Sequence, residues 1–292
     1  PQILKKREFQ YEQGVQGLRL ILWGMFKKVV IADSLAPMVD DIFSNYQDFG
    51  GETLWLGAIY FAFQIYCDFS GYSDIAIGTS KLFGFELMSN FKFPYFSRNI
   101  GEFWRRWHIS LSTWFRDYLY IPLGGSKEGR WKSVRNIFII FLVSGFWHGA
   151  NYTFVFWGLF HSLLFLPSFI LKTNRTYKSS TIGEGTLLQT LKEFTQIIIT
   201  FLLVTMGWVF FRSETLLDSF VYLSKMFFDF DIPNKLDNGV LYVLLILFID
   251  IHFRKDERLI LTLKTRWILY LVLTILVMYK FNSLNTFIYF QF

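Results

Sequence analysis

Long apolar segments separated by shorter polar and basic stretches dominate the pattern of this 292-residue chain. A bilayer offers no water to pair backbone N–H and C=O groups, so segments of this kind are predicted to be helices. The pattern therefore predicts an all-α, polytopic membrane protein. The expected apolar segments are 18–36, 53–67, 134–147, 152–171, 194–211, 240–251 and 267–281.

The first apolar segment, 18–36, differs from a simple span because Lys27 and Lys28 stand in its middle. A charged side chain is costly in hydrocarbon unless its long stem carries the ammonium to the surface. We therefore expect a tilted or kinked helix whose lysines reach the interface.

The segment that begins at Thr53 becomes polar between Asp68 and Asp74 without losing its helical pattern. These two acids are interpreted either as intramembrane functional carboxylates or as ordinary acids at a helix end. Gly71 and Gly78 predict close packing against another helix, because small residues let backbones approach.

Residues 88–125 are aromatic and basic but contain no clean apolar span. Pro94, Pro122 and the Gly124-Gly125 pair interrupt any long helix. Irregular backbone at membrane depth must be covered by protein or line a watery cavity. The stretch is therefore predicted to form re-entrant or interfacial helices.

The basic residues indicate how the chain crosses the membrane. Basic loops near 127–135, 172–192 and 254–266 are expected on the cytoplasmic side, and the acid-rich loop 212–238 and the C-terminus outside. The segment that starts at Val134 then runs outward.

The stretch Ser144-Gly-Phe-Trp-His-Gly-Ala-Asn151 puts polar groups inside the long apolar run from Val134 to Leu171. A helix from Val134 to Trp147 rises only about 21 Å at 1.5 Å per residue, whereas the hydrocarbon core is about 30 Å thick. His148 is therefore expected below the outer face, and an ionisable residue at that depth indicates a functional site.

A second histidine lies in the segment 101–117. If this segment is one helix, His108 shares a face with Trp104, while Arg105 points to headgroups or to a charged ligand. The alternative is an amphipathic interfacial helix with a structural histidine. His148 makes a catalytic pair with His108 the stronger hypothesis, and His161 and His252 are interpreted as structural.

Composition narrows the function classes. The chain is 53% hydrophobic, 21% aromatic and only 18% charged, against about 25% charged residues in soluble domains. The net charge of +6 resides mostly in the loops, which is typical of membrane topology and gives no reason to expect a nucleic-acid partner. One cysteine, Cys67, excludes an internal disulfide framework and a Cys-based zinc site.

The sequence also lacks the G-x-S-x-G, P-loop and H-E-x-x-H motifs. Two histidines without a third ligand at ordinary spacing make a metal site unexpected. The remaining chemistry is base-assisted transfer or a covalent step on an unidentified group. Asn151 would orient a ring or hold an acyl carbonyl, and Trp147 and Trp107 would wall a tunnel.

Two stretches, FWRRWHISLSTWFRDYLYIPLGG (103–125) and SGFWHGANYTFVFWGLFH (144–161), resemble the membrane-bound O-acyltransferase (MBOAT) family, in particular its alginate O-acetyltransferase branch. The resemblance covers essentially the whole chain, and the family has further helices before it, so this chain is expected to be a C-terminal portion. Shorter similar stretches are LWGMFKKVVIADSLAP (22–37), YCDFSGYSDIAIG (66–78), FKFPYFSRNI (91–100), GWVFFRS (207–213) and FIYFQF (287–292).

The resemblance implies one MBOAT domain over 1–292, with 88–125 lining a central tunnel and 134–171 forming the catalytic helix pair. It makes His148 the catalytic histidine and His108 a second histidine in the same tunnel. The other residues expected to line the tunnel or contact substrate are Trp104, Arg105, Arg106, Trp107, Trp147, Asn151 and Asp68.

The resemblance further implies a multi-pass protein of the bacterial inner membrane, surrounded by lipid, without a tightly bound cofactor. A cytoplasmic donor, acetyl-CoA or another acetyl donor, would meet an acceptor from outside. That acceptor would be a polysaccharide or an extracytoplasmic SGNH-type acetyltransferase. Arg105, Arg106 or the Lys27-Lys28 pair would attract donor phosphates, although snorkelling explains them equally.

Two other functions remain open. D-alanyl transfer to teichoic acid would need a carrier-protein dock on the cytoplasmic face. A transporter with broken helices would show inverted repeats, which are not visible in this sequence.

Overall fold

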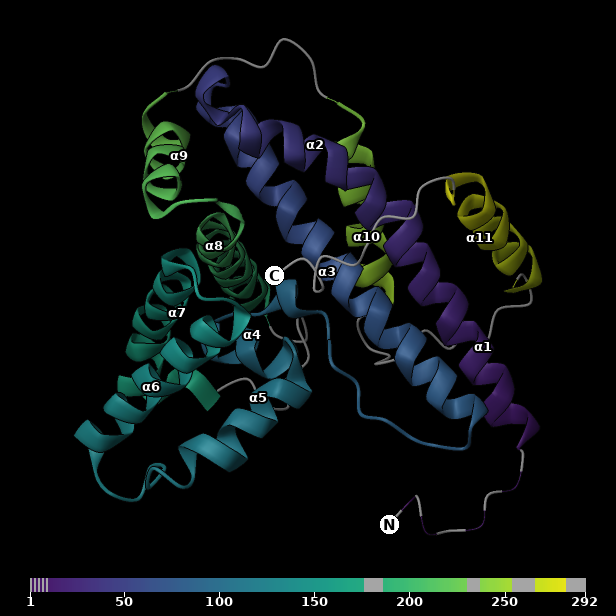
Figure 1. The fold of residues 1–292 in the computed structure, drawn as a ribbon, viewed down its shortest axis with the longest axis horizontal. Coiled ribbons are helices and arrows are strands. Elements are labelled where there is room, and N and C mark those ends of the chain that lie inside the picture. The colour runs from purple at the N-terminus through teal and green to yellow at the C-terminus, as the bar shows by residue number, and fades with distance from the viewer. Residues whose placement is uncertain are drawn as a thin grey trace. The chain divides into compact units, whose positions relative to one another are not determined.

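The computed structural model describes residues 2, 4, 6, 8, 10–175, 186–229, 237–253 and 266–281. No described residue lies in a strand, as the apolar patterning predicts (Figure 1). The helices are α1 (Tyr11–Met25), α2 (Asp33–Ser44), α3 (Gly51–Leu82), α4 (Ile100–Arg106), α5 (Ile109–Phe115), α6 (Arg130–His148), α7 (Tyr152–Ile170), α8 (Leu187–Arg212), α9 (Leu216–Phe228), α10 (Gly239–Phe253) and α11 (Arg266–Lys280).

The chain forms two compact units, each assembled from separate stretches. Unit 1 comprises residues up to Asp40, Tyr60–Asn90 and the chain from Lys235 onward. Unit 2 comprises Asp41–Ile59 and Phe91–Asn234. The expected single domain over 1–292 stays a prediction.

In unit 1, α1 and α3 pack antiparallel through two pairs of glycines. A Cβ on Gly24 would lie 2.5 Å from the carbonyl oxygen of Gly71, and one on Gly78 would lie 2.5 Å from that of Gly17. Only a residue without a side chain fits at such a separation. The expected close packing at Gly71 and Gly78 is confirmed.

A π-helical stretch, Phe26–Ala32, joins α1 to α2 and carries both lysines of the first apolar segment. The expectation that they snorkel to the surface is wrong, because Lys27 is 5% and Lys28 is 6% exposed. Acids of the same unit hold them instead: the Lys27 ammonium lies 2.6 Å from Asp74, and the Lys28 ammonium lies 2.6 Å from Asp68.

In unit 2, α7 is the central helix and packs against α4, α6, α8 and α9 (Figure 1). Its apolar length supplies the core, and Trp157, Gly158 and His161 are all buried. Helix α6 runs along α7 as the other half of a hairpin, which matches the expected helix pair over 134–171.

The stretch expected to be irregular, 88–125, contains two seven-residue helices, α4 and α5, followed by the π-helical stretch Arg116–Tyr120. The assumption of one continuous helix over 101–117 is wrong. Trp107 ends α4 and His108 takes a left-handed conformation with φ 41° and ψ 59°. Trp104 and His108 therefore do not share one helix face.

A helix also forms where a loop was expected. Helix α9 lies inside 212–238 and begins with a capping box, in which Thr215 and Asp218 each bond the other's backbone N–H. Such reciprocal capping pairs two of the donors that a helix start leaves open. The helix was missed because the many acidic residues of this stretch were interpreted as a loop.

Helices α7 and α8 are, of the described helices, the two that are long and apolar enough to cross a membrane. They correspond to the expected segments 152–171 and 194–211. Most of the expected basic loop 254–266, half of the loop 172–192, and the similar stretch 287–292 lie outside the described residues. Membrane depth, re-entrant passage and a tunnel stay predictions.

Candidate active site

His148 is the last residue of α6, at the turn of the α6–α7 hairpin. Two glycines bring these helices into backbone contact. A Cβ at Gly145 would collide with the carbonyl oxygen of Phe154, and one at Gly158 with that of Phe141. The hairpin is therefore held in one register, which fixes where the His148 ring emerges.

Aromatic rings surround the imidazole of His148 on several sides. The centroids of Trp147 and Phe211 lie 5.0 Å from it, and that of Trp157 lies 5.4 Å away, all edge to face. Apolar walls exclude water and favour the neutral ring. A neutral imidazole in such a setting can take a proton from a hydroxyl group, which is the role of a general base.

Asn151 closes the hairpin turn and ties it to the end of α8. Its Oδ1 accepts a hydrogen bond from the Thr153 backbone N–H at 3.1 Å, which caps α7. Its Nδ2 donates to the Glu214 carbonyl at 3.0 Å. Neither contact involves His148, so the structure shows Asn151 positioning the turn, and its expected contact with an acyl carbonyl stays a prediction.

His108 lies in the same unit and close enough to His148 to act on it electrostatically. Its left-handed backbone costs about 1–2 kcal/mol for a residue with a Cβ. Strained residues of this kind cluster at functional sites, where the surrounding packing holds them. The structure thus brings together the two histidines that the sequence selected.

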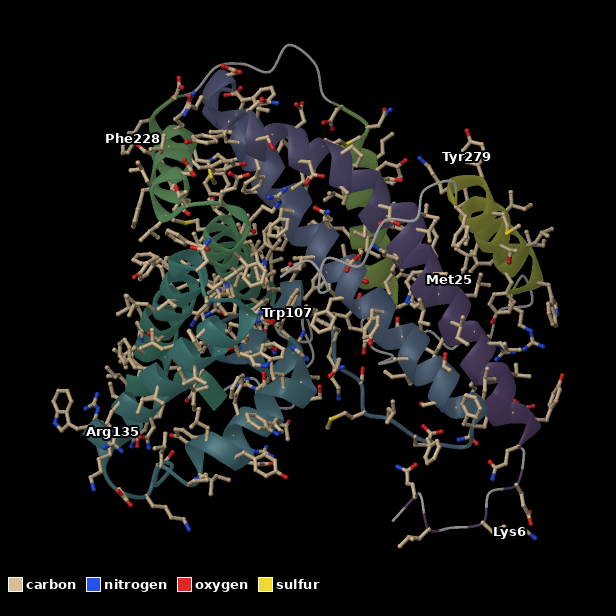
Figure 2. All side chains as sticks on the ribbon, viewed as in Figure 1. Lys6, Met25, Trp107, Arg135, Phe228 and Tyr279 are labelled. Atoms are coloured by element: carbon tan, nitrogen blue, oxygen red, sulfur yellow. The ribbon has the colours of Figure 1, made fainter. Side chains whose placement is uncertain are left out.

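The three selected tryptophans have different surroundings. Trp107, labelled in Figure 2, is 5% exposed and packs against Trp208 at 4.9 Å. Trp104 packs edge to face against Trp157 at 5.7 Å. Trp147 is 48% exposed. Only Trp147 combines contact with His148 and an open surface; the other two belong to the aromatic core.

The selected arginines have partners inside unit 2. Glu102 lies 2.6 Å from Arg106 and 2.9 Å from the buried Arg98. Arg105 donates to the carbonyl of Asn174. Glu102 balances positive charge here within the protein, and contact of Arg105 and Arg106 with a donor phosphate stays a prediction.

His161, which sequence reasoning set aside, is fully buried, and neither ring nitrogen has a hydrogen-bond partner among the described residues. Trp157 connects the two histidines of α7 and α6, since its ring lies 5.0 Å from His161 and 5.4 Å from His148. A Cβ on Gly207 would lie 2.7 Å from the Nε2 atom of His161.

The stretch 207–213, quoted above only for its resemblance, supplies several of these contacts. Gly207 gives room to His161, Trp208 packs on Trp107, and Phe211 packs on His148. Their roles were missed because the stretch reads as an ordinary apolar helix end. The similarity of this stretch to the family was the available signal in the sequence.

Asp68, also selected, belongs to unit 1, where the 2.6 Å contact with Lys28 accounts for its charge. A place for it beside the histidines stays a prediction. Within the described ranges, no group of three or more His, Cys, Asp or Glu side chains is arranged to hold a metal ion.

Comparison with known proteins identifies the family. The profile of MBOAT, the membrane-bound O-acyltransferase family, matches residues 4–181. The chain is 46% identical over 202 residues to the probable alginate O-acetylase AlgI of Pseudomonas syringae pv. tomato, which is 69% of this chain and 36% of that protein. It is 39% identical over 216 residues to the peptidoglycan O-acetyltransferase of Helicobacter pylori, covering 74% of this chain and 39% of that one.

A third relative is the teichoic acid D-alanyltransferase of Bacillus subtilis, which is 34% identical over 162 residues, or 53% of this chain and 40% of that protein. The matched stretch thus spans well under half the length of each of these relatives. The family profile nevertheless covers more than half of the 292 residues. The chain therefore belongs to the membrane-bound O-acyltransferase family.

Proposed function

We propose that the whole protein transfers an acetyl group from a cytoplasmic donor, acetyl-CoA or a similar thioester, to an acceptor outside the bacterial inner membrane. The acceptor is a polysaccharide or a partner acetyltransferase of the SGNH type that passes the group on. His148 is the catalytic base, and the protein crosses the membrane several times.

The observation that carries this proposal is the placement of His148. A rigid hairpin turn presents one imidazole between the rings of Trp147, Trp157 and Phe211. These rings shield the imidazole from water on several sides, and the half-exposed side that remains is where an acceptor hydroxyl would approach it.

The chemistry balances without a metal or a covalent intermediate. An imidazole nitrogen of His148 takes the proton of the acceptor hydroxyl while its oxygen attacks the thioester carbonyl carbon. The C–O bond forms, the C–S bond breaks, and the departing thiolate receives the proton from the imidazolium. His108, within electrostatic range, orients or polarises one of the partners.

Acetyl transfer is favoured over D-alanyl transfer by the relatives. The two relatives named as acetyl-transferring enzymes are 46% and 39% identical to this chain, whereas the D-alanyltransferase is 34% identical over a shorter stretch. Mass analysis of the envelope polymers separates the two, because an acetyl ester and a D-alanyl ester differ in mass and charge.

The test introduces the substitution His148→Ala into the full-length protein, expressed in the cells that normally make it. Removing a general base lowers the rate about 10²- to 10⁴-fold, so polymer acetylation should fall to background. The matched control is His252→Ala, because His252 lies exposed in unit 1 against Phe248 and Phe253. Undiminished acetylation by His148→Ala at normal membrane abundance refutes the assignment.

A further inference from the structure

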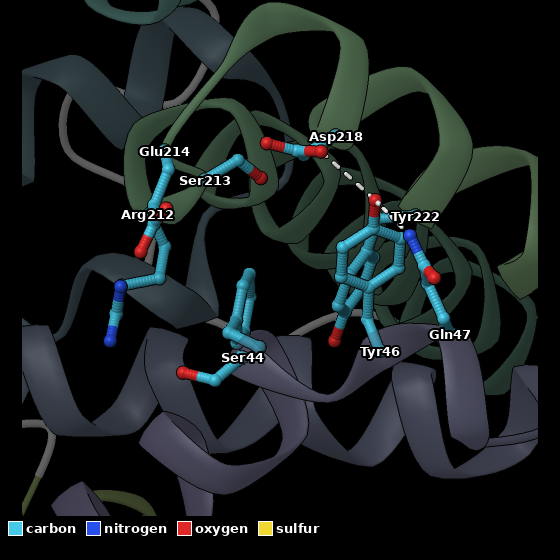
Figure 3. A pocket seen from close by; sticks show the side chains of 9 residues that line it. Ser44, Tyr46, Gln47, Arg212, Ser213, Glu214, Asp218 and Tyr222 are labelled. Carbon is cyan, nitrogen blue, oxygen red and sulfur yellow. Dashed lines mark hydrogen bonds between the residues drawn. The ribbon is translucent and has the colours of Figure 1, made fainter.

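A cavity of about 250 Å³ opens in unit 2 where the ends of α2 and α8 meet the start of α9. Figure 3 shows Arg212, Ser213 and Glu214 on one side and Tyr46, Tyr222 and Gln47 on the other. The remaining lining residues are Phe43, Ser44 and Asp218. None of these side chains was selected from the sequence.

The cavity is built on an aromatic base. The rings of Phe43 and Tyr222 stack at 4.6 Å, and the Arg212 guanidinium lies 5.6 Å from the centre of the Phe43 ring. The Tyr46 hydroxyl donates to Asp218 at 2.9 Å, which fixes the orientation of both groups (Figure 3). The walls are therefore preformed.

The rim of the cavity carries polar groups of several kinds. Ser44, Gln47 and Glu214 are exposed side chains that provide a hydroxyl, an amide and a carboxylate. Hydroxyls and amides both donate and accept hydrogen bonds, whereas a carboxylate only accepts. Such a mixture matches a ligand that itself presents groups acting as donor and acceptor at once.

Two contacts join this cavity to the catalytic turn. Phe211, which packs on His148 at 5.0 Å, is followed directly by the lining residue Arg212. The carbonyl of the lining residue Glu214 accepts the hydrogen bond of Asn151, which lies three residues after His148. A ligand in the cavity is therefore held by the segments that position the base.

We propose that this cavity is the acceptor-recognition site and binds one pyranose ring of a glycan through its hydroxyl groups. The inference rests on the proposed function, since it names what the acyl acceptor presents. The sugar ring enters between the polar groups of the rim, and its hydroxyls bond Gln47, Glu214 and Arg212. A neighbouring ring of the same chain then reaches His148.

The size and polarity of the cavity favour a sugar over a segment of a partner protein. Pockets for drug-sized ligands measure about 300–1,000 Å³, so about 250 Å³ holds one ring-sized group. Sites that receive a peptide offer an apolar groove or an open strand edge. Here the rim is polar, and only the base is aromatic.

The experiment measures binding of two soluble hexasaccharides, one of uronic acid units and one neutral glucan, to the purified full-length protein in detergent without donor. Glu214→Ala and Gln47→Ala are the variants. Glu214 supports Asn151 through its carbonyl and not through its side chain, and the Gln47 carbonyl accepts from Lys225. Both substitutions therefore leave these supports in place.

At least one hexasaccharide should bind, and its affinity should fall about tenfold in Glu214→Ala and about fivefold in Gln47→Ala. The matched controls are Glu128→Ala and Gln13→Ala, which do not line the cavity; Glu128 is exposed and Gln13 is half-buried. The acceptor KM should rise in the cavity variants and stay at the wild-type value in the two controls.

The proposal is overturned if neither sugar binds the wild type, or if each sugar binds the variants with the same affinity as the wild type. Variants that keep sugar affinity but lose a partner acetyltransferase also overturn it, in favour of protein docking. Because binding is measured without donor, it does not depend on His148. If the cavity variants lose sugar binding but His148→Ala acetylates fully, only the proposed function is refuted. If the cavity variants keep sugar binding and His148→Ala abolishes acetylation, only the cavity assignment is refuted.

Discussion

The buried Lys28 of unit 1 allows a test of how much its ion pairs contribute to the free energy of unfolding. The Lys28 ammonium lies 2.6 Å from Asp68 and 2.8 Å from Asp33. The side chain of Asp68 is 1% exposed and that of Lys28 is 7% exposed. When Lys28 is removed, water cannot replace it at the buried Asp68 carboxylate, whereas the Asp33 side chain is 14% exposed and reaches water.

Replacing Lys28→Met therefore leaves a buried carboxylate without its cation. Removing one partner of a buried ion pair costs about 3–5 kcal/mol, because the desolvated charge that remains must be neutralised or rehydrated. Adding Asp68→Asn removes that stranded charge. The double variant should recover about 2–3 kcal/mol of the loss, the range of coupling energies between residues in direct contact.

The assay is reversible unfolding of the full-length protein in mixed micelles of increasing sodium dodecyl sulfate, followed by tryptophan fluorescence. Lys132→Met is the control, because Lys132 pairs with Glu128 at 2.8 Å but both side chains are about half exposed. It should leave the free energy of unfolding unchanged. A loss in Lys28→Met no larger than that in Lys132→Met, or no recovery in the double variant, refutes the reasoning.

Three further predictions concern unit 2. Gly158→Ala should cost about 1–3 kcal/mol in the same assay, because its methyl group would collide with the carbonyl of Phe141; an unchanged unfolding midpoint would contradict the close hairpin. Asn151→Ala removes the cap of α7, worth about 1 kcal/mol, and should lower kcat more than that stability loss explains, whereas a kcat equal to wild type would show that the turn needs no tie to the end of α8. Hydrogen bonds from Thr215 lower the pKa of the Asp218 carboxyl, so its contribution to the start of α9 is present above the usual carboxyl pKa and is lost as the pH falls through the lowered value. The hydrogen-exchange protection factors of α9, corrected for the intrinsic pH dependence of exchange, should therefore fall in acid, and this fall should be absent in Asp218→Asn.

The positions of the long apolar helices were predictable because they depend on local patterning. Segments expected at 152–171, 194–211 and 240–251 correspond to α7, α8 and α10 with ends shifted by at most two residues, except that α8 begins seven residues earlier, at Leu187. The apolar residues of a spanning segment and the caps beside it act over one or two turns, so they can be read from the sequence without knowledge of the partners.

The failures arose where a residue's environment is supplied by a distant segment. Lys27 and Lys28 look like snorkelling side chains until Asp68 and Asp74, about 40 residues later, are placed beside them. The break at His108 was missed because nothing in the residue types demands a left-handed backbone there. Packing of Trp107 and its neighbours, and not local preference, sets that conformation.

The candidate site divides in the same way. His148 could be selected as a candidate from the sequence because an ionisable side chain inside an apolar segment costs free energy and therefore indicates a functional site. Phe211 packs on His148, and the Glu214 carbonyl accepts a hydrogen bond from Asn151. Both contacts require the end of α8 to meet the α6–α7 turn, about 60 residues away along the chain. No periodicity of either segment indicates that meeting.

Local chemistry thus predicted the long apolar helices and singled out His148 as a candidate, because the cost of a polar group in an apolar segment is a property of that segment alone. Only the folded arrangement decided which charges are paired, where the helix breaks at His108, and which side chains line the cavity at the ends of α2 and α8. These depend on close approach of residues far apart in the chain; in unit 1, for example, the glycine contacts between α1 and α3 bring Lys27 and Lys28 near Asp74 and Asp68.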